Sequence, residues 1–262
     1  MKTQVTNSKT TSAIHTLHYK AMESEMSFGL FTDMQAVRWL EELDYVFAPV
    51  ELSSTYAVQL ATACRTKLFN DEIERFTEEG RVVNLGCGFD TRGLFHDKKE
   101  WLDVDLPEIM DMRNDLSAGY GRVVSYNICG DVFDEVVLKS LVNDYPTLVL
   151  LEGFVDVYER EKVFGLLRNI RLFSKDLTVV LDACGSVFRQ VPHPIQGETE
   201  DKYVIRFGLD SPKDLEECGY KVEKSTSVHE IAKDRWEPLE ESYRQYPTMK
   251  EHSTKVIVLR GV

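Results

Sequence analysis

The chain has 262 residues, a formal net charge of −13 at pH 7 and five scattered cysteines without a C-x-x-C pair. This length suits one large α/β domain, and no Gly/Ser/Pro-rich linker divides it, so we expect a single domain over residues 1–262. The acidic balance argues against nucleic-acid binding, which relies on clustered Lys and Arg. The cysteines suit reduced core positions better than disulfides or a zinc site.

The N-terminal part of the chain predicts a tail followed by helices. Residues 1 to about 12 are polar and carry no secretory signal, and no apolar run approaches the roughly 18 residues of a membrane span, so we expect a cytoplasmic protein. Apolar residues recur at helical spacing over 36–47 and again over 57–68, the second stretch behind candidate N-caps Ser53 and Ser54. These helices form an expected N-terminal cap, residues 1–75.

A glycine-rich turn follows the first predicted strand. The mostly apolar residues 82–85 indicate a buried strand, after which Gly86 and Gly88 allow a sharp turn and close approach to a ligand. A second strand over 101–106 carries Asp105 about twenty residues past the first glycine. Nucleotide-binding α/β units place an acid for ribose hydroxyls at that distance. The pattern therefore predicts a nucleoside-binding crevice.

The remainder of the glycine motif narrows the choice of cofactor. Thr91 stands where a dinucleotide-binding loop has its third glycine, and no Lys-Ser/Thr pair of a P-loop follows. The turn thus favours a cofactor that has ribose and adenine but no phosphate. An NAD-dependent oxidoreductase is the alternative enzyme class.

The rest of the chain alternates between predicted strands and helices. Helices are expected over 159–173 and, with Ser, Pro and Gly at its ends, over 211–219. The further strands are expected over 121–128, 147–153, 177–182, 221–228 and 255–260. This alternation predicts a seven-stranded, doubly wound α/β sheet whose last two strands form an antiparallel pair.

Two motifs, Asn84-Leu-Gly-Cys-Gly-Phe-Asp-Thr-Arg92 and Trp101-Leu-Asp-Val-Asp-Leu-Pro-Glu108, carry a resemblance to a known family. They resemble the class I S-adenosylmethionine (SAM) methyltransferases, specifically the leucine carboxyl methyltransferase family with its TcmP-like polyketide carboxyl methyltransferase branch. The resemblance implies a Rossmann-like fold, SAM as cofactor and methylation of a carboxylate. The residues of the two motifs resemble the small-molecule branch more than the protein-methylating branch.

The resemblance also implies roles for single residues. It gives Arg65 the methionine carboxylate of SAM, a task that suits the planar fork of a guanidinium, and it places Lys20 at the same end. Glu152, after the fourth strand, would receive the ammonium. Adenine would meet Asn127 and Ile128, or Asp131 if the loop register differs. The implied cofactor positions are Lys20, Arg65, Gly86, Gly88, Asp105, Leu106, Asn127, Ile128 and Glu152.

The segment 185–208 is expected to be a lid or substrate insertion at the mouth of the crevice. The candidate substrate contacts are Tyr19, Arg189, His193, Tyr203 and Arg206. His15 and His18 are three residues apart without an apparent third ligand, so we expect no metal site. Whether these two histidines or His193 take part in the site is left open.

The predicted activity is a SAM-dependent O-methyltransferase acting on a small carboxylic acid. A carboxylate is already anionic at neutral pH, so we expect positioning rather than a catalytic base. A protein C-terminal carboxylate and a phenolic hydroxyl are alternative acceptors, and a SAM-binding regulatory protein without turnover is the alternative of another class. We expect no nucleic-acid or membrane partner and leave a homodimer open.

Overall fold

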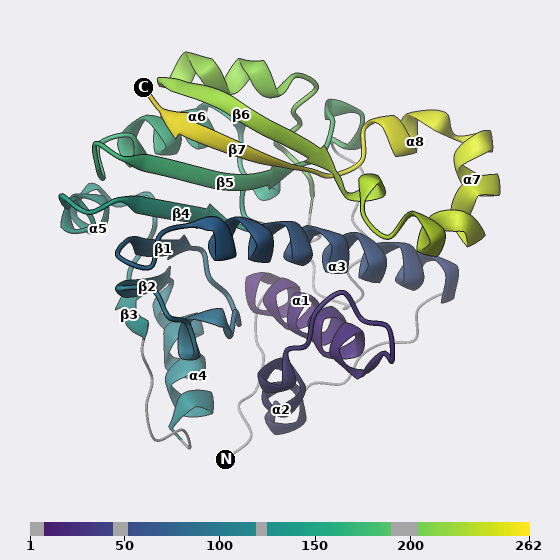
Figure 1. The fold of residues 1–262 in the computed structure, drawn as a ribbon, viewed down its shortest axis with the longest axis horizontal. Helices are drawn as coiled ribbons and strands as arrows, with labels where there is room; N and C mark the ends of the chain where they lie inside the picture. The colour runs from purple at the N-terminus through teal and green to yellow at the C-terminus, as the bar shows by residue number, and fades with distance from the viewer. Residues whose placement is uncertain (1–7, 44–51, 119–124, 190–203) are drawn as a thin grey trace.

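The structure, a computed structural model, describes residues 8–43, 52–118, 125–189 and 204–262 (Figure 1). Its centre is a seven-stranded sheet in the order β3-β2-β1-β4-β5-β7-β6. The strands are β1 Arg81–Leu85, β2 Glu100–Asp105, β3 Ser125–Cys129, β4 Thr147–Leu151, β5 Leu177–Ala183, β6 Tyr220–Ser227 and β7 Lys255–Gly261. The strands β1 to β5 run parallel and β7 runs antiparallel to both neighbours, which confirms the predicted sheet.

Helices cover both faces of the sheet. The α-helices are α1 Ser8–Glu25, α2 Met34–Glu42, α3 Leu52–Arg75, α4 Pro107–Ser117, α5 Glu135–Ser140, α6 Arg160–Ile170, α7 Glu240–Gln245 and α8 Pro247–Glu251. The 3-10 helices are η1 Arg92–Leu94, η2 Val155–Val157, η3 Ser186–Phe188, η4 Pro212–Cys218, η5 Val228–Glu230 and η6 Lys233–Leu239. Figure 1 shows α1 lying alongside α3, and α7 and α8 beyond one end of β6 and β7.

Boundaries near the N-terminus differ from the sequence prediction. The expected tail ends earlier, because α1 begins at Ser8. The α3 helix begins at Leu52, so Ser53 and Ser54 lie inside its first turn and are not its N-caps. The compact helix expected over 211–219 is the 3-10 helix η4, which ends at Cys218. Ser211 stands directly before it and Gly219, in the left-handed conformation (φ 87°), directly after it, as predicted.

The core forms two layers because successive residues of a strand face opposite sides of the sheet. Val83 and Leu85 of β1 belong to a cluster that includes Leu167 of α6. Val82, which precedes them, packs with Phe69 of α3 on the other face. β4 and β5 are buried along their whole length, as central parallel strands are. The central strands are therefore packed on both faces, and the loops that follow them start from buried positions.

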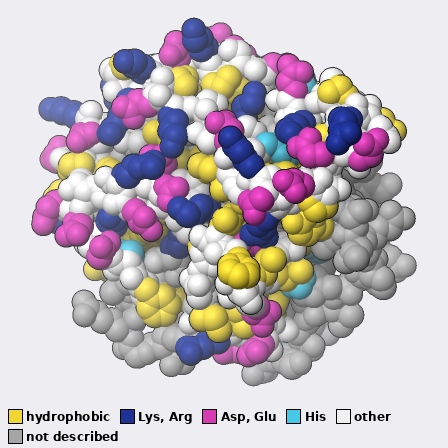
Figure 2. Space-filling model, turned by 45° about the vertical axis from the view of Figure 1, so that its right-hand side comes forward, with side chains coloured by type: hydrophobic (Ala, Val, Ile, Leu, Met, Phe, Trp, Pro, Cys, Tyr) yellow, Lys and Arg dark blue, Asp and Glu magenta, His cyan; other side chains and the backbone are white. Residues whose placement is uncertain are grey.

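The surface carries charges of both signs. Figure 2 shows Lys and Arg interspersed with Asp and Glu over the face it draws. Among the described residues, no helix is long and apolar enough to cross a membrane.

Candidate active site

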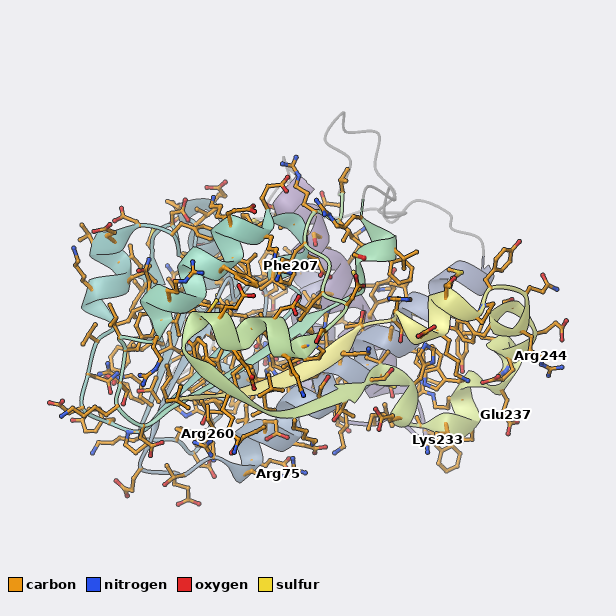
Figure 3. All side chains as sticks on the ribbon, turned by 90° about the horizontal axis from the view of Figure 1, so that it is seen from above. Arg75, Phe207, Lys233, Glu237, Arg244 and Arg260 are labelled. Atoms are coloured by element: carbon orange, nitrogen blue, oxygen red, sulfur yellow. The ribbon has the colours of Figure 1, made fainter. Side chains whose placement is uncertain are left out.

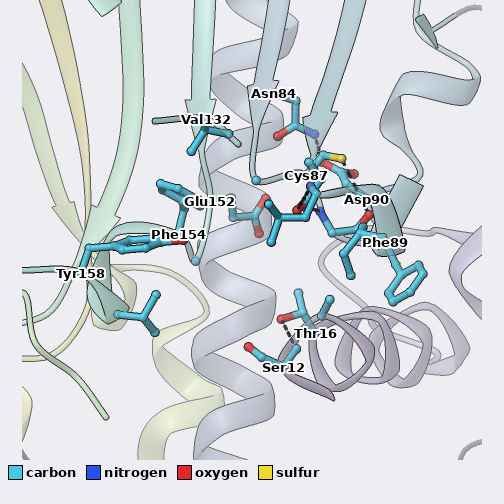
Figure 4. A pocket seen from close by; sticks show the side chains of 18 of the residues that line it. Ser12, Thr16, Asn84, Cys87, Phe89, Asp90, Val132, Glu152, Phe154 and Tyr158 are labelled. Carbon is cyan, nitrogen blue, oxygen red and sulfur yellow. Dashed lines mark hydrogen bonds between the residues drawn. The ribbon is translucent and has the colours of Figure 1, made fainter. Parts of the chain in front are cut away.

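A cavity of about 360 Å³ opens beyond the carboxyl ends of β1, β2 and β4 (Figure 4). Ligands of open α/β sheets bind at this edge. Ser12, Thr16 and Lys20 of α1 cover one side of the cavity, and Val204 and Arg206 line it from the chain that follows β5. The N-terminal helix α1 thus forms part of the wall, which a bare nucleotide-binding core lacks.

The glycine turn forms the floor of the cavity. Gly86 and Gly88 both have positive φ, 67° and 51°, as the predicted sharp turn requires. A Cβ at Gly86 would overlap the ring of Phe154. The Gly88 N–H donates to Asp105 Oδ2 at 2.8 Å, and the Leu106 N–H donates to Asp105 Oδ1 at 2.7 Å. Two backbone bonds therefore fix the orientation of the predicted ribose-binding carboxylate.

A network of buried hydrogen bonds stabilises this turn. Arg113 of α4 donates to the carbonyl oxygens of Gly88 and Asp90, at 2.9 and 2.6 Å, and to the Asp103 carboxylate at 2.7 Å. The Asn84 amide donates to Asp90 and Asp103, both at 3.0 Å. These bonds turn the loop carbonyls inward and leave the Gly88 N–H facing Asp105. Asp103, the first acid of Asp-Val-Asp, thus stabilises the turn through Arg113 and Asn84, a role that the sequence did not reveal.

Glu152 lies at the centre of a cluster of cations. Its Oε1 accepts a hydrogen bond from Thr66 at 2.8 Å and lies 3.4 Å from Arg65 Nε. Its Oε2 accepts from Arg92 at 2.5 Å and lies 3.9 Å from the Lys20 ammonium. Burial acts to raise the pKa of Glu152, but Lys20, Arg92 and Arg65 outweigh it and lower the pKa to about 2. Glu152 is therefore an ionised carboxylate throughout the physiological range.

Arg92 is the member of this cluster that sequence reasoning missed. Its guanidinium joins Asp90 of the glycine turn to Glu152 after β4. Burial acts to raise the pKa of Asp90, but Arg92 and then Lys20 outweigh it and hold that pKa well below its ordinary value. An arginine directly after a glycine turn that carries an acid was the available signal.

Lys20 and Arg65 take different positions relative to the cavity. Lys20 lines it, and its buried ammonium lies 3.7 Å from Asp90 and 3.9 Å from Glu152, beyond hydrogen-bond length. Arg65 lies behind the wall, where it contacts Glu152 and, at 3.4 Å, Asp182. The structure thus brings both predicted cations to one end of the cavity, with Lys20 in front.

The candidate adenine contacts lie on opposite sides of the end of β3. This strand continues to Cys129, so Asn127 lies within it and bonds to Asn114 of α4 at 2.7 Å. Ile128 packs against the core. Asp131, beyond the strand, lines the cavity, and its Oδ1 accepts from the Phe133 N–H at 2.9 Å. Asp131 is therefore better placed than Asn127 to meet the adenine.

The predicted substrate contacts are dispersed. Arg206 lines the cavity, whereas Arg189 is exposed after η3 and outside the cavity wall. Tyr19 is half-buried, with its ring centroid 5.8 Å from that of His18. His193 and Tyr203 lie outside the described residues. Of the five candidates, the structure brings Arg206 to the cavity.

An aromatic group that the sequence did not single out lines the wall opposite α1. The ring centroids of Phe133 and Phe154 lie 5.9 Å apart, and those of Phe133 and Tyr158 lie 4.7 Å apart. The ammonium of Lys162 sits 3.9 Å from the Phe133 centroid. Burial raises the pKa of Tyr158 to about 12, so its hydroxyl is a neutral donor. The three rings come from two loops and meet only in the folded chain.

The donor set fits SAM. The cavity offers a fixed carboxylate at Asp105, a cation at Lys20, an ionised acid at Glu152 and aromatic surface. Among residues of the described ranges, no group of three or more His, Cys, Asp or Glu is arranged to hold a metal ion.

Comparison with known proteins gives the family. The family model for leucine carboxyl methyltransferases matches residues 18–171. The "Tetracenomycin polyketide synthesis O-methyltransferase TcmP" of Streptomyces glaucescens is 26% identical over 175 residues, which cover 64% of this chain and 63% of that protein. The "S-adenosyl-L-methionine-dependent methyltransferase dpfgK" of Gibberella zeae is 26% identical over 199 residues, 66% and 65% of the two chains. The matches span just under two thirds of these relatives.

Solved structures show the same fold at low sequence identity. Magnesium protoporphyrin IX methyltransferase (ChlM) from Synechocystis with bound SAM has a TM-score of 0.54 at 8% identity, covering 99% of this chain and 100% of that chain. A SAM-dependent methyltransferase from Clostridium acetobutylicum has a TM-score of 0.51 at 10% identity, covering 81% and 92%. The sheet, the glycine turn and the match over 18–171 agree: the chain belongs to the leucine carboxyl methyltransferase family, with a class I methyltransferase fold and SAM as its cofactor.

Proposed function

We propose that this chain methylates a carboxylate oxygen of a small organic acid. The observation that carries the proposal is the wall of the cavity where the Lys162 ammonium lies 3.9 Å from the Phe133 ring centroid and Arg206, 3.9 Å from Glu159, supplies a second cation. This wall suits an anion attached to an apolar body. The family match over residues 18–171 supports a carboxyl acceptor, and the similarity to TcmP supports a small molecule.

At the inner end of the cavity, the proposal assigns roles to the charged side chains. Asp105 accepts from the ribose hydroxyls, Lys20 pairs with the methionine carboxylate and Glu152 receives the ammonium. Glu152 stays ionised because three cations surround it. When bound, SAM supplies an electrophilic methyl group on its sulfonium. The fixed charges of the protein hold the cofactor in one orientation, and this positioning contributes to catalysis by proximity.

At the outer end, the protein orients the acceptor. A carboxylate is ionised at neutral pH, so no proton need be removed before transfer. Arg206 and Lys162 attract and align it, and Phe133, Phe154 and Tyr158 exclude water from around it. The Tyr158 hydroxyl is neutral at physiological pH, since burial raises its pKa to about 12, and it is available to donate a hydrogen bond to the acceptor.

The experiment is an assay with methyl-labelled SAM and a panel of small aromatic and aliphatic acids. A methyl ester releases volatile labelled methanol on brief treatment with base, whereas methyl ethers and methylated amines do not. We expect base-labile label that depends on the acid. Label that is stable to base would refute a carboxyl acceptor and favour a phenol.

The same assay distinguishes small-acid methylation from action on a protein and from binding without turnover. A peptide with a free C-terminus that is methylated in place of the small acids would favour a protein acceptor. Tight SAM binding without transfer to any member of the panel would favour a regulatory protein.

A further inference from the structure

Asp182, at the end of β5, contacts two parts of the cofactor end of the cavity without lining the cavity itself. Its side chain is buried, at 1% exposure. Oδ1 accepts a hydrogen bond of 2.6 Å from the Gly153 N–H, and Oδ2 lies 3.4 Å from Arg65 Nη1. One carboxylate thus holds the turn that follows β4 and a guanidinium from α3.

Gly153 allows this arrangement. It has φ 63°, and a Cβ at this position would lie 3.2 Å from both terminal nitrogens of Arg65. The guanidinium therefore lies against the backbone of the Glu152-Gly153 turn. From there Arg65 contacts Asp182 on one side and Glu152 on the other, each at 3.4 Å.

We propose that Asp182 is a positioning residue for the cofactor site, which fixes the Glu152-Gly153 turn and holds Arg65 against Glu152. It acts through these two partners and does not touch SAM. The inference rests on the proposed role of Glu152 in SAM binding, and it is independent of the methyl acceptor.

A second buried acid provides a readout for this role. Asp156 of η2 lies near Asp182 of β5, Cys184 just after β5 and Arg65 of α3. Its backbone also contacts the chain after residue 203. Its carbonyl oxygen accepts from the N–H groups of Arg206 at 2.7 Å and Phe207 at 3.0 Å. Figure 3 labels Phe207, which is fully buried.

The charge of Asp182 is one of the effects that act on Asp156. Burial first, and then Asp182, raise the pKa of Asp156 above its ordinary value, against the opposing effects of the Cys184 backbone and Arg65. Burial also raises the pKa of Asp182 itself. SAM carries a net positive charge, so we expect SAM affinity to rise with pH as Asp156 becomes ionised. Removal of the Asp182 charge lowers the pKa of Asp156, and the rise moves to lower pH.

The test compares Asp182→Asn with the wild-type chain by calorimetric titration with SAM between pH 6 and 8.5. Asn keeps the size and the acceptor for Gly153 but turns an amide towards Arg65. We expect about tenfold weaker binding at pH 8 and a pH profile displaced to lower pH. The matched control is Asp176→Asn, an exposed acid just before β5 that pairs with Arg260 at 3.6 Å. It is expected to bind SAM like the wild type.

A double-mutant cycle separates positioning from general damage. In an Arg65→Met background, Asp182→Asn should change SAM affinity by less than about twofold, because its partner is already lost. If the two substitutions weaken SAM binding by independent factors, so that the double variant shows the product of both, the inference is overturned. An Asp182→Asn variant with unchanged SAM affinity and pH profile would also overturn it.

Two further variants cover the remaining outcomes. If Asp182→Asn does not fold, Arg65→Lys keeps the charge but loses the fork that joins two carboxylates, and it should weaken SAM binding similarly. Unchanged affinity in Arg65→Lys would also overturn the inference. If Glu152→Ala binds SAM normally, the role of Glu152 and the inference both fail, whatever the methyl-transfer assay shows.

Discussion

Replacement of Glu152 by Gln tests the cluster of charged side chains around Glu152 at the cofactor end of the cavity. Gln has the same shape and keeps an acceptor for Thr66, but it removes the negative charge that Arg92, Arg65 and Lys20 share. Its amide nitrogen would face a guanidinium in a buried site. The substitution therefore leaves buried cations without one of their partners, which is more costly than the loss of an exposed ion pair.

The magnitude follows from the pKa. Burial raises the pKa of Glu152, the three cations outweigh it, and the result is a fall from 4.5 to about 2. That difference corresponds to roughly 3 kcal/mol of stability at neutral pH. Because the pKa is depressed in the folded state, this contribution is complete above about pH 4.5 and is lost as pH falls towards 2. Glu152→Gln should thus be destabilised at pH 7 and lose less of its remaining stability in acid.

Urea unfolding of both proteins at pH 7 and pH 3 measures this difference, and SAM titration measures the binding. We expect SAM affinity to fall by roughly ten- to a hundredfold, since the ammonium loses a charged partner. The control Glu161→Gln, at an exposed position of α6, should stay within about 0.5 kcal/mol of the wild type. Equal stability of Glu152→Gln and wild type at pH 7, or a difference that does not shrink in acid, would refute the reasoning.

Three further predictions address single walls of the cavity. Lys20→Met should weaken SAM binding about tenfold in calorimetry, while decarboxylated SAM, which lacks the expected partner, should be affected less. Asp131→Ala should weaken binding of adenosine-containing ligands more than Asn127→Ala does. A larger effect of Asn127→Ala would instead identify Asn127, within β3, as the adenine contact. Arg206→Gln should raise KM for an acid acceptor by roughly fivefold with kcat nearly unchanged, and an equal loss in kcat would place Arg206 at the reacting atoms.

The sequence predicted those parts of the fold and site that depend on local or periodic pattern. Alternating apolar strands and helices sufficed for the doubly wound sheet, because parallel strands must be buried on both faces. Gly86, Gly88 and Asp105 were predictable because a turn with positive φ and an acid at the end of the next strand have fixed spacing along the chain. Their geometry in the structure agrees with that spacing.

Other site residues depended on where elements end and on which side chains meet. The end of β3 at Cys129 decides that Asp131 lines the cavity while Asn127 faces α4, and strand ends are poorly defined by sequence. Arg92 follows the acid of the glycine turn, but its contact with Glu152 joins separate parts of the chain. Asp182 contacts Arg65 of α3, and no spacing in the sequence marks that contact. Local conformational preferences thus determined the turn and its acid, whereas long-range packing of buried charges decided which neighbours hold them in place.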